Sequence, residues 1–170
     1  MITLVLGGTR SGKSLVAERL AERASGQVTY VATNALDPAD TDHAARIALH
    51  RRRRPPHWLT VEVPTPADLA AVLAATDEVA LVESLGGWVA GHDELDVDPV
   101  SLLAALSARS ADTIVVSEEV GFSVHPTTEL GRRFVDVLGE VNQQVAGIAD
   151  RVLLVVAGRT LELPPGQGSP

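Results

Sequence analysis

Short apolar runs recur along the chain of 170 residues and are separated by longer stretches with amphipathic patterns. Each run is apolar at almost every position, which is typical of strands buried on both faces of a parallel sheet. The runs that predict strands are Ile2–Leu6, Val28–Ala32, Val79–Glu83, Thr113–Ser117 and Val152–Ala157.

The stretches between these runs carry the spacing and the start signals of helices. After the first run, apolar residues at positions 15, 16, 20 and 24 share one face of a helix. Proline or aspartate stands near the start of several later patterns, and Pro55-Pro56 would end the earliest of them. The further predicted helices are His43–Arg53, Pro66–Ala75, Pro99–Ala108 and Thr127–Ile148.

Strands that alternate with helices predict an α/β fold, with a mostly parallel sheet, helices on both faces and right-handed crossovers. In such folds, ligands bind at the carboxyl ends of the strands. We expect one domain over residues 1–163, because this length suffices for a hydrophobic core. Residues 164–170 are rich in proline and glycine, so they are expected to form a disordered tail.

The overall charge and composition exclude several classes of protein. The net charge of −8 argues against a general binder of nucleic acid or of anionic membranes. The absence of cysteine excludes disulfides, thiolate metal sites and cysteine nucleophiles. No apolar run approaches the length of a membrane span, and the first strand leaves no space for a signal peptide. The expectation is therefore a cytoplasmic protein.

One glycine-rich segment has the pattern G-x-x-x-x-G-K-[ST] of a phosphate-binding loop, and it lies between a predicted strand and a predicted helix. In such a loop, backbone N–H groups and the start of the following helix face a phosphate. Lys13, the only lysine of the chain, would reach the β and γ phosphates, and Ser14 would ligate Mg²⁺. The pattern predicts a nucleotide-binding domain. Its residues are Gly7, Gly8, Thr9, Arg10, Ser11, Gly12, Lys13 and Ser14.

Phosphate-loop proteins place the carboxylate that orients the magnesium ion at the end of a buried strand. Several acidic residues at strand ends are candidates for this role. Glu83 ends one predicted strand and is the favoured candidate. Glu118 and Glu119 follow another predicted strand and are its alternatives. Glu62 lies in a further short apolar stretch, where it is either a ligand contact or simply an acid on an edge strand.

Four consecutive arginines, Arg51, Arg52, Arg53 and Arg54, allow three interpretations. They could form a nucleic-acid patch, but no aromatic residues accompany them as a stacking platform. They could also be a solvated charge run at the end of a helix. The favoured interpretation is a polyphosphate clamp, because guanidinium groups bind phosphate oxygens in pairs.

His50 directly precedes these arginines and is either a surface residue or a nucleophile. A neutral imidazole can attack an α-phosphate when nearby cations stabilise the developing charge and the leaving pyrophosphate. The flanking arginines would also lower the pKa of the imidazole and keep the attacking nitrogen free of a proton.

Taken together, these residues resemble the bifunctional adenosylcobinamide kinase/adenosylcobinamide-phosphate guanylyltransferase family, from residue 2 to about residue 163. The His-Arg run and the Val-Asn-Gln segment are more specific to the family than the phosphate loop. The matching segments are Gly7–Ser14, Tyr30–Thr33, Ala45–Ile47, His50–Pro55, His57-Trp58, Glu119–Gly121, Pro126, Arg133-Phe134, Asp136, Gly139 and Val141–Gln143.

The resemblance implies a RecA-like phosphate-loop NTPase fold, a homotrimer and two successive reactions. ATP or GTP would phosphorylate adenosylcobinamide, and GMP from GTP would then pass through a histidine onto the new phosphate, giving adenosylcobinamide-GDP. The guanylylated histidine of the family matches His50, and Lys13 would act with it in catalysis. The nucleotide contacts of the family map onto Gly7–Ser14, Thr33, Asn34, Ala35, Arg51–Arg54, Glu62 and Glu83.

Three positions depart from the family pattern. The family commonly has asparagine where this chain has Glu118, and usually threonine and asparagine where Gly86 and Gly91 stand. All three lie closer to the expected γ-phosphate than to His50. They therefore concern the kinase reaction, or the contacts with the corrinoid, more than guanylyl transfer.

Two other functions are compatible with the phosphate loop. One is a small-molecule kinase that transfers a phosphoryl group in a single step, without a covalent histidine intermediate. The other is a nucleotide-binding regulatory module that binds tightly without turnover.

Overall fold

The computed structural model of the chain describes residues 1–33, 54–122, 124 and 126–166. Two short 3-10 helices, η1 (Pro66–Asp68) and η2 (Asp93–Leu95), accompany the regular elements. In chain order the strands and α-helices are β1 (Ile2–Gly7), α1 (Lys13–Arg23), β2 (Val28–Ala32), β3 (Leu59–Glu62), α3 (Leu69–Ala74), β4 (Val79–Glu83), α4 (Leu85–Ala90), α5 (Val100–Ala108), β5 (Thr113–Glu118), α6 (Glu129–Ile148), β6 (Arg151–Val156) and β7 (Arg159–Leu163).

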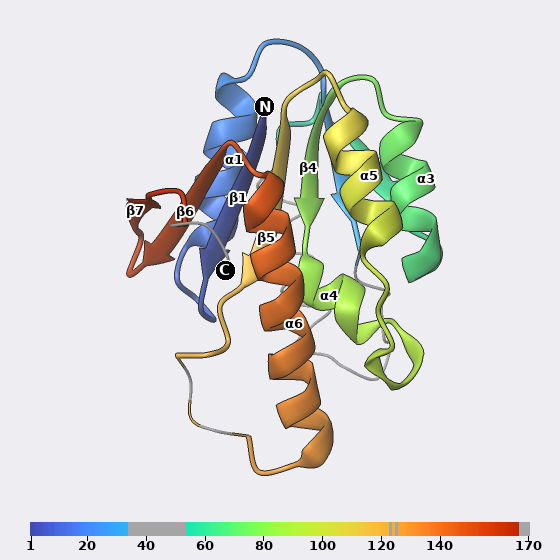
Figure 1. Cartoon of the computed structure of the whole chain (residues 1–170). Coiled ribbons are helices and arrows are strands. Elements are labelled where there is room, and N and C mark those ends of the chain that lie inside the picture. The colour runs from blue at the N-terminus through green and yellow to red at the C-terminus, as the bar shows by residue number, and fades with distance from the viewer. Residues whose placement is uncertain (34–53, 123, 125, 167–170) are drawn as a thin grey trace.

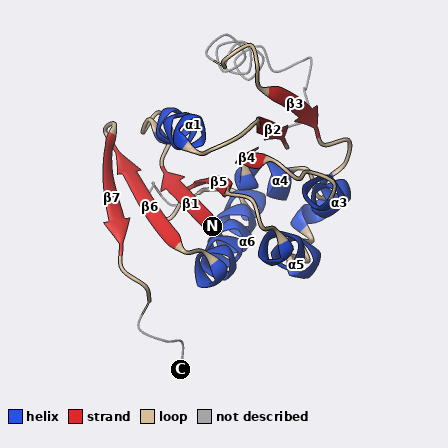
Figure 2. Cartoon of the chain, turned by 90° about the horizontal axis from the view of Figure 1, so that it is seen from above, coloured by secondary structure: helices blue, strands red, loops and turns tan. Residues whose placement is uncertain are grey.

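The described strands form one seven-stranded sheet in the order β3-β2-β4-β5-β1-β6-β7. Neighbouring strands are parallel except for β6 and β7, which form an antiparallel hairpin. Helix α1 covers one face of the sheet, whereas α3, α4, α5 and α6 cover the other, as the views in Figures 1 and 2 show. The predicted α/β fold with helices on both faces is confirmed.

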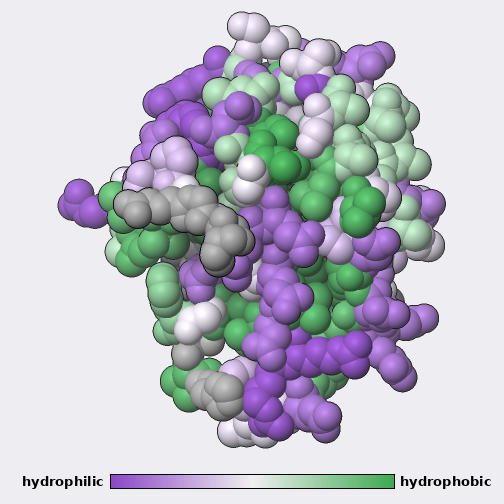
Figure 3. All heavy atoms as spheres, in the orientation of Figure 1, coloured by the Kyte–Doolittle hydropathy of each residue, from purple (hydrophilic) through white to green (hydrophobic). Residues whose placement is uncertain are grey.

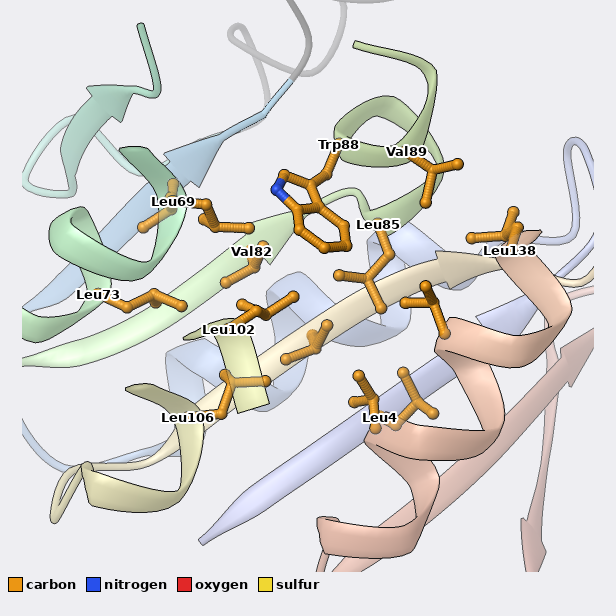
Figure 4. Packing of buried hydrophobic residues seen from close by; sticks show 14 of the residues in the cluster. Leu4, Leu69, Leu73, Val82, Leu85, Trp88, Val89, Leu102, Leu106 and Leu138 are labelled. Carbon is orange, nitrogen blue, oxygen red and sulfur yellow. The ribbon is translucent and has the colours of Figure 1, made fainter. Parts of the chain in front are cut away.

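Alternate residues of each buried strand face opposite layers, so the sheet supplies two hydrophobic cores. Val5 packs on the side of α1, while Leu4 and Leu6 face the layer of four helices. Figure 4 shows this larger core, where α3, α4, α5 and α6 turn leucine, valine and tryptophan side chains toward the sheet. The fully buried leucines of this core are Leu4, Leu69, Leu73, Leu85, Leu102, Leu106 and Leu138.

Helix α6 has the amphipathic character that the sequence predicts. Its inner face buries Leu138, Val141 and Val145. Hydrophilic side chains follow its outer face, which lies toward the viewer in Figure 3. Glu140 of this helix is exposed. No described helix has the length and the apolar character needed to cross a membrane.

The five predicted strands are confirmed, each to within one residue at either end. The predicted helix at 66–75 begins as the 3-10 helix η1 and continues as α3. The predicted helix at 43–53 lies outside the described residues. Strand β7 ends at Leu163, where we placed the end of the domain, while the disorder of residues 164–170 stays a prediction.

Helix α4, the 3-10 helix η2 and strand β7 were not predicted from the sequence, and β3 was weighed only as an edge strand around Glu62. Helix α4 has only six residues and includes Gly86 and Gly87, which weaken any helical signal. Strand β7 follows β6 through the two-residue turn Ala157-Gly158, in which both residues have positive φ angles of 51° and 74°. This backbone is the tight turn that fits the twist of a hairpin, and glycine at its second position was the available signal.

Candidate nucleotide site

The phosphate loop connects the end of β1 to the start of α1, at the carboxyl edge of the parallel sheet. Within it, the Ser11 N–H donates to the Gly8 carbonyl at 3.2 Å, and the Lys13 N–H donates to Ser11 Oγ at 3.3 Å. Gly12 has a φ angle of 95°, which favours glycine. A Cβ on Gly7 would lie 2.7 Å from the Val155 carbonyl oxygen, so the close approach of β6 also requires glycine there.

The hairpin turn between β6 and β7 supports this loop from the side. The Gly158 N–H donates to the Ser11 carbonyl at 2.7 Å. A Cβ on Gly12 would lie 3.3 Å from Gly158 Cα, so two glycines meet where the turn and the loop touch. Sequence reasoning missed this contact because it missed β7. The hairpin gives the loop a fixed backbone partner outside its own segment.

Lys13 begins α1 and is buried, with 9% of the residue exposed. Its Nζ donates to the Gly8 carbonyl at 3.5 Å and lies 3.5 Å from Oε1 of Glu118. The only lysine of the chain therefore points back over the loop, where a bound phosphate would meet it.

The structure brings Ser14 and Glu83 together at the adjacent strand end. Ser14 Oγ donates to Glu83 Oε1 at 2.6 Å. Oε2 of Glu83 is shut off from solvent and has no hydrogen-bond partner among the described residues. Burial raises the pKa of Glu83 to about 7; the Ser14 hydrogen bond lowers it, and the Glu118 charge raises it further.

These two residues fit a magnesium ion. Mg²⁺ takes oxygen ligands, and one or two protein oxygens suffice because substrate phosphates and waters complete its octahedron. The described residues hold no group of three or more histidine, cysteine or acidic side chains that could bind a metal ion by themselves, so a fully protein-made metal cage is not the arrangement found there. The unpartnered Oε2 of Glu83 beside the Ser14 hydroxyl is the oxygen that such an ion would satisfy.

Thr33, at the end of β2, is tied to the end of β4. Its Oγ1 donates to the Ser84 carbonyl at 2.6 Å, and its N–H donates to the Glu83 carbonyl at 3.1 Å. The predicted contact residue Thr33 thus lies beside the predicted magnesium carboxylate. Asn34 and Ala35 lie outside the described residues.

Glu62 and Arg54 lie farther along the same edge. In the sheet register, Ala32 of β2 pairs with Glu62 on one side and with Glu83 on the other. Two strand spacings, about 10 Å, therefore separate the backbones of the two acids. Arg54 stacks on Tyr30, with Cζ 3.3 Å from the ring centroid, and its Nη1 donates to Thr60 Oγ1 at 3.3 Å.

The predicted nucleophile, His50, lies outside the described residues. So do the other three arginines of the run, Arg51, Arg52 and Arg53. Arg54 alone represents the arginine run in the described structure. Its Nε is buried and has no hydrogen-bond partner among the described residues. The polyphosphate clamp stays a prediction.

The two alternative acids at the end of β5 differ in what they touch. Glu118 accepts hydrogen bonds at Oε2 from Ser84 Oγ and from the Gly86 N–H, both at 3.1 Å. Glu119 turns elsewhere and accepts from the Gly121 N–H at 2.7 Å. Of the three acids weighed from the sequence, Glu83 is the one bonded to Ser14, while Glu118 pairs with Lys13.

Sequence reasoning also missed the roles of Asn142 and Ser84. Asn142 is buried on α6, and its Nδ2 donates to the Glu118 carbonyl at 3.0 Å. Ser84 caps α4 by accepting from the Gly87 N–H, while its hydroxyl donates to Glu118. The polar residue directly before Leu85 was the signal for the cap. Both residues fix the end of β5 beside the phosphate loop.

A comparison with family models decides which group of proteins this chain resembles as a whole. The model described as cobinamide kinase / cobinamide phosphate guanyltransferase matches residues 3–163. The chain belongs to this family. The match covers the phosphate loop, all seven described strands except the first residue of β1, and the segment that carries His50 and the arginines.

Curated relatives agree with the cobinamide kinase / cobinamide phosphate guanyltransferase assignment. The bifunctional adenosylcobalamin biosynthesis protein CobP of Pseudomonas aeruginosa is 40% identical over 172 residues, which cover 96% of this chain and 97% of that protein. The bifunctional adenosylcobalamin biosynthesis protein CobU of Escherichia coli (strain K12) is 38% identical over 178 residues, with 93% and 97% covered. The counterpart in Salmonella typhimurium has the same identity and coverage.

Solved structures extend the likeness in fold beyond the family. An ATPase from the type III secretion system of pathogenic bacteria superposes with a TM-score of 0.55 at 11% identity. The match covers 90% of this chain and 50% of that one. At this identity the likeness concerns the fold alone, and it agrees with the RecA-like arrangement that the resemblance implied.

Proposed function

We propose that the chain catalyses both reactions in the name of its family. A nucleoside triphosphate phosphorylates the side-chain hydroxyl of adenosylcobinamide, and GMP from GTP is then joined to the new phosphate with release of pyrophosphate. The observation that carries this proposal is the Lys13, Ser14 and Glu83 arrangement, in a chain that matches the family over residues 3–163.

In the first reaction, the loop and Lys13 would orient the triphosphate and neutralise its charge. Ser14 and Glu83 would hold Mg²⁺, which supplies positive charge between the phosphates when it is bound. The loop would act by positioning the triphosphate, since phosphoryl transfer needs alignment and electrostatic stabilisation more than covalent help from the protein. ATP and GTP are both proposed as donors.

In the second reaction, the His50 imidazole would attack the α-phosphate of GTP. A bond between nitrogen and phosphorus forms, the bond between the α-phosphorus and the bridging oxygen breaks, and pyrophosphate leaves. An oxygen of the corrinoid phosphate then displaces the imidazole and takes the GMP. Arg51–Arg54 would stabilise the charge on the leaving pyrophosphate.

The same proposal includes the assembly and the surroundings of the enzyme. We infer a homotrimer that acts in the cytoplasm on corrinoid substrates, from the resemblance of this sequence to its family. Sedimentation of the purified protein tests the homotrimer, and a monomer at micromolar concentration would contradict it.

The covalent step is tested with Mg²⁺ and GTP labelled at the α-phosphate, followed by denaturation and intact mass measurement. We expect a label that acid removes and base does not, and its loss in His50→Ala. His57→Ala is the matched control, because His57 is an exposed histidine seven positions along the chain. Label retained by His50→Ala would contradict the proposed nucleophile.

The two rival functions give different results when adenosylcobinamide is added and the label is placed on either the γ-phosphate or the α-phosphate. A single-step kinase would transfer label from the γ-phosphate to the corrinoid. The α-phosphate label would never become covalently attached to the protein. A regulatory module would bind the nucleotide without transferring either label to adenosylcobinamide. Transfer of both labels, in that order, is the result expected here.

A further inference from the structure

A carboxylate lies against the lysine of the phosphate loop. Oε1 of Glu118 is 3.5 Å from Lys13 Nζ, and the two side chains are 28% and 11% exposed. Lysine at this position of a phosphate loop meets the β and γ phosphates of a nucleotide. Glu118 therefore contacts the same ammonium group that a triphosphate needs.

The position of Glu118 is fixed by the turn between β4 and α4. Ser84 Oγ and the Gly86 N–H both donate to its Oε2 at 3.1 Å. Ser84 Oγ in turn accepts from the Gly87 N–H at 3.3 Å. These donors do not depend on Lys13, so they would keep the carboxylate in place when Lys13 turns toward a phosphate.

Gly86 makes room for this carboxylate. A Cβ at position 86 would overlap Glu118 Oε2 and lie 2.9 Å from its Cδ. Gly86 is buried in α4, so a side chain there could not turn into solvent. The position of the Glu118 carboxylate thus depends on glycine at 86, since any larger residue there would displace the carboxylate from this position.

The charge of Glu118 acts on its surroundings at this distance. It is one of the groups that raise the pKa of Glu83, which lies at the end of the neighbouring strand β4. A γ-phosphate is also an anion, and it would contact the same Lys13 ammonium group that Glu118 contacts. Two unit charges about 4 to 5 Å apart near a protein surface change an affinity by roughly tenfold to several hundredfold.

We propose that Glu118 is a specificity-determining residue of the phosphate site, which disfavours a triphosphate relative to a diphosphate because its carboxylate competes for Lys13 and repels the γ-phosphate. This inference rests on the proposed function in that the loop binds a nucleotide. Its consequence for the kinase reaction is that the nucleoside diphosphate product binds well and inhibits by competition.

The test is a set of dissociation constants for ADP and for the non-hydrolysable β,γ-imido analogue of ATP, measured by calorimetry with Mg²⁺ and without corrinoid. In Glu118→Gln, which keeps the shape and removes the charge, we expect the triphosphate analogue to bind at least about tenfold more tightly. ADP should gain less. Glu140→Gln removes one charge from the outer face of α6 and should change neither constant.

A second variant tests the same idea without removing a charge. Gly86→Ala should displace the carboxylate and shift the ratio of the two constants in the same direction. The double variant Glu118→Gln/Gly86→Ala should bind the triphosphate no more tightly than Glu118→Gln, because both changes act on one carboxylate.

The outcomes separate this inference from the proposed function. Unchanged or weaker binding of the triphosphate by Glu118→Gln overturns the inference, and weaker binding would mean that Glu118 helps to hold a cation. If the unsubstituted protein binds neither nucleotide, the proposed function itself fails. Binding of both nucleotides with an unchanged ratio in Glu118→Gln would leave the function standing and reject the role of Glu118.

Discussion

The buried carboxylate of Glu83 should make the stability of the protein depend on pH. Burial is the main cause of its raised pKa of about 7, compared with 4.5 for an ordinary glutamate. The folded state favours the protonated acid, so ionising Glu83 lowers the free energy of unfolding. This loss of stability is absent below about pH 4.5, grows as the pH rises and is complete above about pH 7. A shift of this size corresponds to about 3 kcal/mol of unfolding free energy.

The perturbation is Glu83→Gln, which removes the ionisable group and keeps its size. Between about pH 5.5 and about pH 8.5, the unsubstituted protein should lose about 2 kcal/mol more stability than the variant, from the part of the titration in that window. A buried glutamine amide can change the stability of the variant by a constant amount, but it adds no pH dependence. The comparison of slopes therefore isolates Glu83.

The assay is urea unfolding in buffer with a chelator, so that no divalent ion binds the site, at both pH values for each protein. Glu140→Gln is the control, because Glu140 is exposed on the outer face of α6. It should show the pH dependence of the unsubstituted protein. Equal pH dependence in Glu83→Gln and the unsubstituted protein would refute the idea that burial of this carboxylate costs stability.

Three further predictions concern the loop and the helices. Lys13→Ala should weaken ATP binding at least about 100-fold, because it removes the buried ammonium group that meets the phosphates; calorimetry measures this. Gly158→Val should destabilise the protein by about 1–2 kcal/mol in urea unfolding, since a β-branched residue is strained at its φ of 74°; an unchanged midpoint would contradict the turn geometry. Gly139→Ala in α6 should stabilise the protein by up to about 1 kcal/mol, seen as a higher melting temperature, because no neighbouring atom lies within 4 Å of the added Cβ.

The fold was predictable from the sequence where burial is simplest. The five apolar runs became strands because both their faces are covered, almost fully in β1, β2, β4 and β5 and partly in β6, so nearly every residue in them is apolar. Helix α4 escaped prediction because its stability comes from the Ser84 cap and from Trp88, whose Nε1 donates to the Pro66 carbonyl at 2.8 Å. Ser84 was the one signal for the cap, and it was too weak to predict a six-residue helix that contains two glycines.

The candidate site was predictable only in part, for a related reason. The phosphate-loop motif identifies Lys13 and Ser14 directly, and the strand-end rule identifies Glu83. The contact between Lys13 and Glu118 depends on strand order and register, since β5 lies next to β1 and Glu118 pairs with Gly7. Strand order is set by tertiary packing, so no local pattern could place this second carboxylate beside the lysine.

The charges of the described site explain why a divalent cation should be needed for nucleotide binding as well as for phosphoryl transfer. Lys13 provides one positive charge, while Glu83 and Glu118 provide two negative charges when both are ionised. A triphosphate brings several more negative charges into the same space. Lys13 is the described cation paired with Glu118, and Glu83 has its hydrogen bond from the neutral Ser14, so Mg²⁺ on Ser14 and Glu83 would offset both the phosphates and the pair of carboxylates. Nucleotide binding should therefore depend steeply on Mg²⁺, and removing the charge of Glu118 should make that dependence shallower.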